Sequence, residues 1–288
     1  MTLEQLKIFA AVAEREHMTR AAEALHLTQS AVSAAIAGLE QHYRVKLFDR
    51  VGRGIMLTEA GRVLLAEARG TLARATSAEQ AMADYAGLRH GKLAIHASQT
   101  IASYFLPPLL VRFQARYPGI EPLLAVGNTA QVARAVKDGA AEIGFVEGPL
   151  QDPALSVEVV AADQMVIVVP PGHEWADGVA LMREDLPRVG WVFREAGSGT
   201  RDAFTQALGD MVLPVTLTVP TNEAVRAAVE AGAGAAALSL LVCARSLAAG
   251  ALARANFQLP ARMFYAVRHK ERYHPKGAAA LLEMARAV

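Results

Sequence analysis

The spacing of apolar residues changes character twice along the chain, and each pattern predicts a different kind of structure. From residue 2 to about residue 42, apolar residues recur at three- and four-residue intervals, which indicates short amphipathic helices. Thr19 and Thr28 precede two of these stretches and are predicted to be their N-caps. Only a few residues around His26 and Leu27 separate the two stretches, so the pattern predicts a helix-turn-helix.

A hairpin and one long helix are predicted next. The segment YRVKLFDRVGRGIMLT alternates apolar and polar residues on both sides of a Gly-Arg-Gly turn, which is typical of the wing of a winged helix. Residues 58–88 contain no proline, and their leucines and alanines fall at helical spacing. Because so long a helix cannot bury its apolar stripe against a small N-terminal unit, we expect it to pair with a copy of itself. The alternative is that its larger apolar residues pack on their own domain; these are Leu64, Leu65, Leu72 and Met82.

From Lys92 onward, short strand-like runs alternate with helical stretches. The predicted strands are KLAIHA, EPLLAV, EIGFVE, MVIVVP, GWVF, VTLTV, AAALS and MFYAV. The predicted helices include residues 104–117, 131–138, 202–208 and 223–231. This alternation predicts mainly parallel sheets covered by helices, arranged as one large sheet or as two small lobes.

Composition adds few limits to this picture. The chain has 288 residues, 53% hydrophobic and 20% charged, which is enough for about two ordinary soluble domains. The formal net charge of +1 does not by itself indicate a nucleic-acid partner. The first residues lack the pattern of a secretory signal, and no apolar run approaches the roughly 18 residues of a membrane span. The single cysteine, Cys243, lies in an apolar segment and fits a reducing cytoplasm as buried filler, with a redox-switch thiol as the alternative.

Neither a metal nor a cofactor is expected. His173, His269 and His274 are widely separated, and no His-x-His or Cys-x-x-Cys spacing occurs, so these histidines are expected to be surface or packing residues. Trp175 and Trp191 are likewise expected to be packing residues.

The opening residues carry a specific resemblance to a known family. The order of LKIFAAVAERE, TRAAEALHLTQSAVSAAIAGLE, LFDRVGRGIMLTEAG and a long helix resembles the amino-terminal domain of LysR-type transcriptional regulators, and the resemblance extends over the whole chain. It implies a winged helix-turn-helix at residues 1–57, a linker and dimerisation helix at 58–88, and a two-lobed α/β effector-binding domain at 89–288 that resembles periplasmic binding proteins. The implied boundaries are lobe I at about 91–161 and 268–288, and lobe II at about 162–267.

This resemblance implies promoter DNA as a partner. The second helix of the helix-turn-helix would place its first residues against base edges in the major groove, while wing arginines would hold phosphates or the minor groove. The implied DNA-binding residues are Thr28, Gln29, Ser30, Ser33, Arg50 and Arg53. Alternatively, Gln29 and Ser30 only start the helix.

Two features of this part of the chain are expected to weaken its binding to DNA. Small residues, Ala34, Ala35 and Ala37, follow the matching serine, where family members commonly carry a long polar side chain. Residues 1–60 contain seven lysines and arginines and seven acidic residues, so this part is formally neutral. Because phosphate neutralisation drives much of DNA affinity, we expect binding to depend on dimerisation, the wing arginines and two half-sites.

The segment EAGSGTR, residues 195–201, has the composition of an anion-binding loop. It lacks the lysine and spacing of a Walker loop, the position of a dinucleotide fingerprint and the form of a nucleophile elbow. Ser198 and Thr200, with free N–H groups at a helix start, would supply neutral donors, and Arg201 would supply a fixed charge. The alternative is a tight turn that caps the helix.

Other strand-to-helix junctions supply similar candidates for the same cleft. Hydroxyl and amide side chains stand at helix starts in the first lobe and again at Thr221 in the second, and each alone is more typical of a routine N-cap. The expected effector-binding residues are Ser98, Gln99, Thr100, Asn128, Thr129, Glu147, Ser198, Thr200, Arg201 and Asn222. Glu147 is expected either to balance Arg201 or to select protonated or cation-bearing effectors.

Taken together, these features predict a cytoplasmic DNA-binding regulator that is not an enzyme. The segments EGP and REAGSGTR resemble the branch of the family tied to sulfite and sulfur metabolism, and GSGTR also occurs in the related carbon-fixation regulators. The resemblance implies a small anionic effector, sulfite, sulfate or a carboxylate metabolite, and a dimer that assembles further into a tetramer. The alternative is a small-anion binding protein or an anion-handling enzyme with an accessory helical domain.

Overall fold

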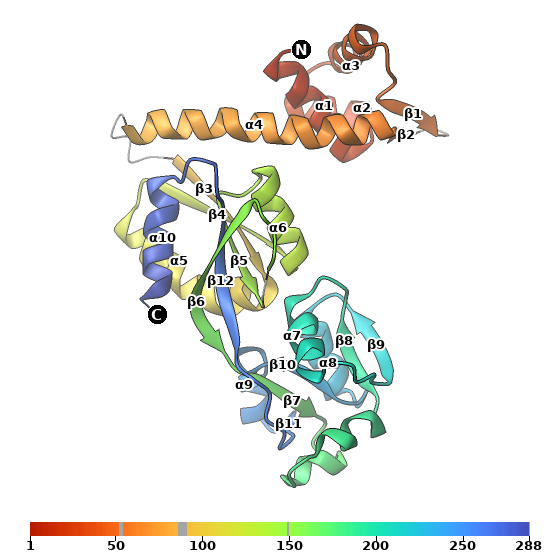
Figure 1. Cartoon of the computed structure of the whole chain (residues 1–288), viewed down its shortest axis with the longest axis vertical. Helices are drawn as coiled ribbons and strands as arrows, with labels where there is room; N and C mark the ends of the chain where they lie inside the picture. Colours follow the sequence, from red (N-terminus) through yellow and green to blue (C-terminus); the bar gives the residue numbers. More distant parts are fainter. Residues whose placement is uncertain (52–53, 86–90, 149, 288) are drawn as a thin grey trace. The chain divides into compact units, whose positions relative to one another are not determined.

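The structure is a computed structural model that describes residues 1–51, 54–85, 91–148 and 150–287. The chain forms two compact units, Met1–Ala83 and Asp84–Val288 (Figure 1). The division between them falls inside the expected linker, residues 58–88, rather than at either of its ends. In the described parts of the chain, no helix is both long and apolar enough to cross a membrane.

The first unit is built on three short helices, α1 (Leu3–Arg15), α2 (Met18–Leu25) and α3 (Gln29–Tyr43). Their apolar faces meet in one core in which Phe9, Val32 and Leu39 are almost completely buried. His26 ends α2 in the left-handed conformation, which turns the chain sharply into α3. The helical spacing of the sequence therefore predicted these helices and their tight turn.

One of the two predicted N-caps is confirmed and the other is wrong. Thr28 caps α3, because its Oγ1 accepts a hydrogen bond of 3.2 Å from the Ala31 N–H. α2 begins at Met18, and its cap is His17, whose Nδ1 accepts from the Arg20 N–H at 3.4 Å. Thr19 therefore lies inside the first turn of α2 instead of capping it.

The wing and the long helix also form. Strands β1 (Phe48–Val51) and β2 (Gly54–Leu57) pair antiparallel, and α4 (Glu59–Tyr85) follows them. Glycine is required at Gly61 for packing, because a Cβ there would lie 2.2 Å from the Leu47 carbonyl oxygen. The glycine lets α4 approach the chain just before the wing.

Three of the four large apolar residues singled out on α4 pack on their own unit. Leu64, Leu65 and Leu72 are partly buried against the helix-turn-helix core. Met82 instead has 64% of its surface exposed, and Val63 has 59%. The alternative of packing within the domain therefore holds for the leucines, and the apolar surface that α4 leaves uncovered is narrower than expected.

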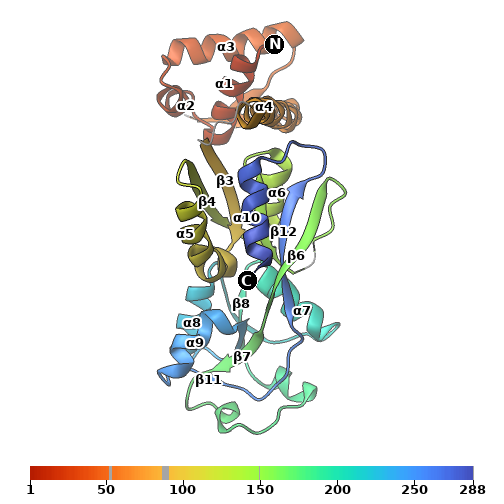
Figure 2. The same cartoon turned by 90° about the vertical axis from the view of Figure 1, so that its left-hand side faces the viewer.

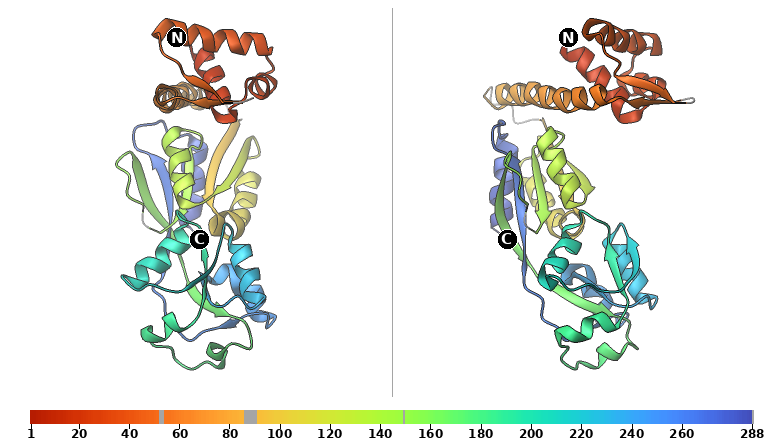
Figure 3. Two further views of the ribbon diagram at one scale, coloured as in Figure 1. Left: turned by 90° about the vertical axis from the view of Figure 1, so that its right-hand side faces the viewer. Right: turned by 45° about the vertical axis from the view of Figure 1, so that its right-hand side comes forward.

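Lobe I of the second unit, residues 91–163 and 262–287, is a five-stranded sheet with helices on both faces. The strands lie in the order β4-β3-β5-β12-β6. They are β3 (Gly91–Ser98), β4 (Ile120–Gly127), β5 (Ile143–Glu147), β6 (Leu155–Asp163) and β12 (Arg262–His269). The helices are η1 (Ile101–Phe105, a π-helical turn), α5 (Leu106–Arg116), α6 (Thr129–Asp138) and α10 (Lys276–Arg286). One core joins α5 and α10 to the sheet, and a second core joins α6 to its other face (Figure 3).

Lobe II, residues 164–261, contains a three-stranded sheet and a strand pair. Its strands are β7 (Met165–Val169), β8 (Trp191–Arg194), β9 (Val215–Val219), β10 (Ala236–Ser239) and β11 (Ala253–Arg254). Its helices are η2 (Glu174–Asp177), η3 (Arg183–Arg188), α7 (Gly199–Leu208), α8 (Asn222–Glu230) and α9 (Leu240–Ala248). Trp175 and Trp191 are buried with ring centroids 6.0 Å apart, and both serve as packing residues.

The chain passes between the lobes twice, along neighbouring strands. β6 leads into β7, and the segment after β11 returns into β12, which is hydrogen-bonded to β6 (Figure 2). The return into lobe I therefore begins at Arg262, earlier than the expected boundary at about 268, because β12 belongs to the lobe I sheet. β6 was not among the predicted strands.

The expectation of mainly parallel sheets is correct for only part of the domain. β3 pairs parallel with β4 and β5, and β8 pairs parallel with β9. β12 runs antiparallel to β5 and β6, and all pairs of the β10-β7-β11 sheet are antiparallel. The antiparallel pairing in lobe I follows from the double crossing, since one strand leaves the lobe where its neighbour returns.

Candidate functional site

The start of α3 presents the polar face that the helix-turn-helix geometry predicts. Gln29 and Ser30 are exposed, and the Gln29 amide donates to the Ser33 hydroxyl at 3.2 Å. Thr28 is occupied by its capping role and by a 3.0 Å contact with the Ser30 hydroxyl. These bonds are local, so they leave this face of the helix exposed to solvent.

The wing contributes one described candidate. Arg50 is exposed on β1, opposite Ile55 on β2. The second expected wing arginine, Arg53, lies outside the described residues. The three alanines after Ser33 add no polar reach to α3, and Ala34 and Ala37 are exposed.

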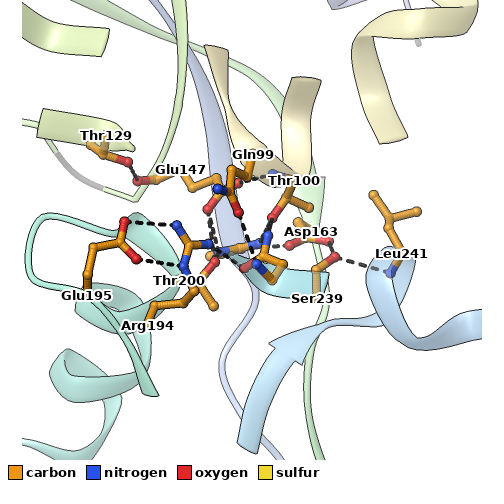
Figure 4. Close-up of polar contacts among 12 residues, drawn as sticks. Gln99, Thr100, Thr129, Glu147, Asp163, Arg194, Glu195, Thr200, Ser239 and Leu241 are labelled. Carbon is orange, nitrogen blue, oxygen red and sulfur yellow. Dashed lines mark hydrogen bonds and ion pairs between the residues drawn. The ribbon is translucent and has the colours of Figure 1, made fainter. Parts of the chain in front are cut away.

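In the second unit, strand-to-helix junctions from both lobes meet at the boundary between them. Residues from these junctions and from the crossing strands form what we call the interlobe network (Figure 4). Its members are Gln99, Thr100, Glu147, Asp163, Arg194, Glu195, Thr200, Asn222, Ser239 and Arg262.

Glu147, at the end of β5, lies at the centre of this network with only 2% of its surface exposed. Its Oε1 accepts from the Thr100 N–H at 3.0 Å, and its Oε2 accepts from the Thr200 hydroxyl at 3.1 Å and from Arg262 Nη1 at 3.0 Å. Burial alone would raise the pKa of this carboxyl, but the Arg262 charge and the hydrogen bonds outweigh it and hold the pKa below its usual range. Glu147 is therefore an ionised carboxylate in a buried site.

Arg262 connects Glu147 to the strands that cross between the lobes. It faces Asp163 in the β6–β12 register, and its Nε donates to Asp163 Oδ2 at 2.6 Å. The Ser239 hydroxyl donates to the other Asp163 oxygen at 2.7 Å. Both side chains of the Arg262–Asp163 pair are at least 95% buried. Asp163 ends β6 and Arg262 begins β12, so this ion pair lies where the chain passes from one lobe to the other.

A second buried arginine, Arg194, lies at the end of β8. It makes a two-pronged ion pair with Glu195, at 2.8 Å and 3.0 Å, and donates to the Asn222 side-chain oxygen at 2.5 Å. Asn222 in turn donates to the Thr100 hydroxyl at 3.0 Å, and Asn128 of lobe I donates to Glu195 at 3.2 Å. The network thus joins the two lobes through side chains from four helix starts.

Backbone groups close the same boundary. Gln99 Oε1 accepts from the Asn222 N–H at 2.9 Å, and Gln99 Nε2 donates to the Pro220 carbonyl at 3.1 Å. The Thr129 hydroxyl donates to the Glu147 carbonyl oxygen at 3.2 Å. Most of the expected effector-binding residues are thus drawn together, and in this structure they bond to one another.

The glycine before Thr200 explains why the loop EAGSGTR is so compact. A Cβ at Gly199 would lie 2.3 Å from the Glu147 carbonyl oxygen and 2.5 Å from the Thr129 hydroxyl, so only glycine lets α7 approach lobe I this closely. Ser198 is buried at the N-cap of α7, but its hydroxyl makes no capping bond.

Arg201 does not join the interlobe network. Its Nη1 donates to the Arg194 carbonyl at 3.1 Å, and its guanidinium lies 5.5 Å from the centre of the Phe193 ring. The expected pairing of Glu147 with Arg201 is therefore wrong, because Arg262 is the partner of Glu147. Thr221 caps α8 by accepting from the Ala224 N–H, which is the routine role.

Ser98 differs from its neighbours because its hydroxyl has no hydrogen-bond partner. It is 2% exposed and lies close enough to the Glu147 carboxylate to lower its pKa, yet its oxygen has no partner at hydrogen-bond geometry. Within the described ranges, the Ser98 Oγ is the one fully buried side-chain polar atom that lacks a hydrogen-bond partner. A buried unpaired hydroxyl is costly, so this position is one where a ligand atom would be stabilised.

Sequence reasoning missed the two buried arginines and Asp163. Arg262 opens an apolar strand and Arg194 ends one, and a charge in such a position is a signal of a buried pair. The partners could not be identified, because Asp163 and Arg262 meet only through the β6–β12 register.

The remaining singled-out residues carry no chemistry in this structure. Cys243 is fully buried, and burial raises the pKa of its thiol to about 12, which disfavours the reactive thiolate of a redox switch. Among the described residues, no group of three or more histidine, cysteine or acidic side chains is placed to hold a metal ion.

The fold and the site define a winged helix-turn-helix protein with a two-lobed sensor, and the comparisons specify the family. Residues 3–62 match the model of bacterial regulatory helix-turn-helix proteins of the lysR family, and residues 86–288 match the LysR substrate binding domain. The chain is 35% identical over 277 residues to the HTH-type transcriptional regulator YeiE of Escherichia coli (strain K12), covering 95% of this chain and 93% of YeiE.

Two further similarities agree with this assignment. A probable RuBisCO transcriptional regulator of Cyanidioschyzon merolae is 33% identical, covering 96% of this chain and 95% of that protein. The crystal structure of full-length CbnR complexed with its target DNA matches with a TM-score of 0.70 at 24% identity, covering 100% of this chain and 99% of CbnR. The chain belongs to the LysR family of transcriptional regulators. Its relatives are regulators rather than enzymes, which overturns the alternative of an anion-handling enzyme.

Proposed function

We propose that this LysR-family regulator binds promoter DNA through α3 and the wing, and senses a small anion at the interlobe network. One observation carries the proposal for the sensor. Helix starts from both lobes direct the Thr100 N–H and the Thr200 hydroxyl to one point, where the Arg262 guanidinium also donates. Helix N-termini, hydroxyls and guanidinium groups are the donors that proteins use for oxyanions and carboxylates.

The effector class follows from these donors and from the branch resemblance of the loop. Sulfite, sulfate and small carboxylate metabolites present oxygen acceptors of the size of the Glu147 carboxylate, and no cofactor is needed to hold them. An effector shifts the sensor only through its different affinity for two arrangements of the lobes. Because the network joins both lobes, a ligand that changes its bonds changes their relative stability.

DNA recognition is proposed to need more than one copy of the chain. The first 60 residues carry no net positive charge, so the counterion release from one copy is small. Pairing through α4 would bring two copies of α3 to two half-sites, and association of such dimers would give a tetramer. The fold shared with the DNA-bound CbnR supports the use of α3 as the recognition helix.

Thermal unfolding of the full chain tests the effector proposal. A ligand that binds the folded state raises the transition temperature as its concentration rises, so one of sulfite, sulfate, formate or acetate should raise it in the wild type. Thr200→Ala should abolish the shift, and Thr205→Ala, an exposed hydroxyl on the same helix, should retain it. No shift with any of these anions would contradict the anion as effector class.

A further inference from the structure

The hydrogen bonds to Glu147 form a complete anion-binding set. The Thr100 N–H is at the start of the helical segment that continues into α5, and Thr200 is in the first turn of α7. These helix starts belong to different lobes, and the Arg262 guanidinium adds a full positive charge. A free carboxylate or oxyanion would need the same donors.

The charge of the network disfavours an additional anion beside its carboxylates. Its bonded members include two guanidinium groups, on Arg194 and Arg262, and three carboxylates, on Glu147, Asp163 and Glu195, for a formal sum of −1. The cavity beside Arg194 and Thr200 has a volume of about 10 Å³, which is at the lower limit for a single water. An anion that entered this cavity would be repelled by the carboxylates and would have no space beside Thr200.

Ser98 supplies the independent sign that another ligand fits here. The Ser98 side chain is buried close to the Glu147 carboxylate, whose pKa it helps to lower, but its hydroxyl meets no group at hydrogen-bond geometry. The two Glu147 oxygens accept from Thr100, Thr200 and Arg262, and neither lies at hydrogen-bond geometry from the Ser98 hydroxyl. An anion with three oxygens has an additional acceptor that could satisfy Ser98 as well.

We propose that Glu147 is an internal competitor of the effector, whose carboxylate occupies the donor set that a small oxyanion or carboxylate takes over on binding. This inference rests on the proposed anionic effector and specifies how the site is regulated. The effector binds by displacing Glu147 from Thr100, Thr200 and Arg262, and so replaces a bridge between the lobes. The strength of the Glu147 bonds then sets the anion concentration to which the regulator responds.

The first test compares anion affinity in the full-length wild type and in Glu147→Gln by isothermal titration calorimetry with sulfite, sulfate, formate and acetate. The glutamine keeps the shape of the side chain but lacks the charge that holds it to Arg262, so it is displaced more easily. We expect the bound anion to have a Kd at least tenfold lower in Glu147→Gln. An equal Kd in both proteins would overturn the inference while leaving the anionic effector intact, and a higher Kd would show that Glu147 contacts the effector instead of competing with it.

The second test does not depend on the natural effector. Glu147→Ala leaves the donor set without its carboxylate, so its transition temperature should fall, and formate should restore at least half of the loss in a concentration-dependent way. Glu158→Ala is the matched control. It also removes a carboxylate that makes ion pairs, with Arg268 and Arg286, but these partners do not include donors from a helix N-terminus. Formate should not restore the control.

These outcomes separate the inference from the proposed function. If no anion binds the wild type or Glu147→Gln, but formate restores Glu147→Ala, the internal carboxylate occupies a real anion site and the proposed effector class is wrong. If formate restores neither alanine variant, the donor set does not bind a free carboxylate and the inference is overturned. Glu147→Gln keeps the size of the side chain and one acceptor oxygen for these donors, so it leaves no cavity and the calorimetric test remains possible even if Glu147→Ala folds poorly.

Discussion

At the scale of single residues, Glu147 shows how a charge is kept inside this protein. A buried carboxylate is stable only when charged and hydrogen-bonding partners surround it, and here Arg262, Thr100 and Thr200 supply them. Removing one partner of such a pair costs up to about 3–5 kcal/mol, because the other charge is left buried. The same partners make the site dependent on pH.

We expect Glu147→Gln to flatten the acid side of the stability profile. The pKa of Glu147 is lower in the folded chain than its ordinary value of 4.5, so its ionisation stabilises the fold above that value, and this contribution is lost as the pH falls toward the lower folded pKa. The transition temperature should therefore fall more steeply below about pH 4.5 in the wild type than in the variant. Glu23→Gln, at an exposed position, serves as the control. Parallel profiles for wild type and Glu147→Gln would contradict this account.

At the scale of elements, the packing of α7 against lobe I depends on one glycine. Gly199→Ala would place a methyl group 2.3 Å from the Glu147 carbonyl oxygen, so α7 must move away and the bonds of Thr200 must weaken. We expect a loss of about 1–3 kcal/mol in the free energy of unfolding, measured by urea denaturation. Gly70→Ala is the matched control: its site is open and lies within α4, so it should be neutral or stabilising by up to about 1 kcal/mol. Equal effects of the two substitutions would contradict the close-approach argument.

The recognition role of α3 is tested at the same scale. Gln29→Ala removes an exposed amide from the start of the helix, and we expect affinity for a specific promoter to fall by about 1–3 kcal/mol. Gln41→Ala removes the same group from the far end of α3, where it is also exposed, and should leave affinity unchanged. Gel retardation with DNA upstream of the protein's own gene measures both. Similar losses would mean that α3 does not insert its first turn into the groove.

At the scale of the whole molecule, the proposed pairing through α4 must use the apolar surface that the helix leaves exposed. Val63 and Met82 are 59% and 64% exposed, so charges at both positions should oppose association without disturbing the core. We expect the double variant Val63→Glu, Met82→Glu to shift from dimer or larger assembly toward monomer in light scattering. Met182→Glu, at a residue 67% exposed in lobe II, is the control. An unchanged molar mass in the double variant would locate the association elsewhere.

Local patterns predicted most of the elements but fewer of their pairings. The helices of the first unit, its wing hairpin and eight of the strands of the second unit were visible as periodic runs, because each buries a face that its own sequence defines. β6 was missed although Leu155, Val157 and Val159 alternate with polar residues. It is also one of the strands that make the expectation of parallel pairing wrong, since β12 returns antiparallel to it and to β5.

The candidate site was likewise predictable from the sequence only in part. The sequence by itself determined which helix starts carry hydroxyl and amide donors, because capping residues and glycines are local requirements of a strand-to-helix turn. Only the tertiary structure decided what those donors bind. Asp163 and Arg262 are brought together by strand register, and Glu147 meets Thr200 because Gly199 lets the second lobe approach the first. Buried ion pairs between residues so distant in the chain depend on the packing of the two lobes, which no local pattern specifies.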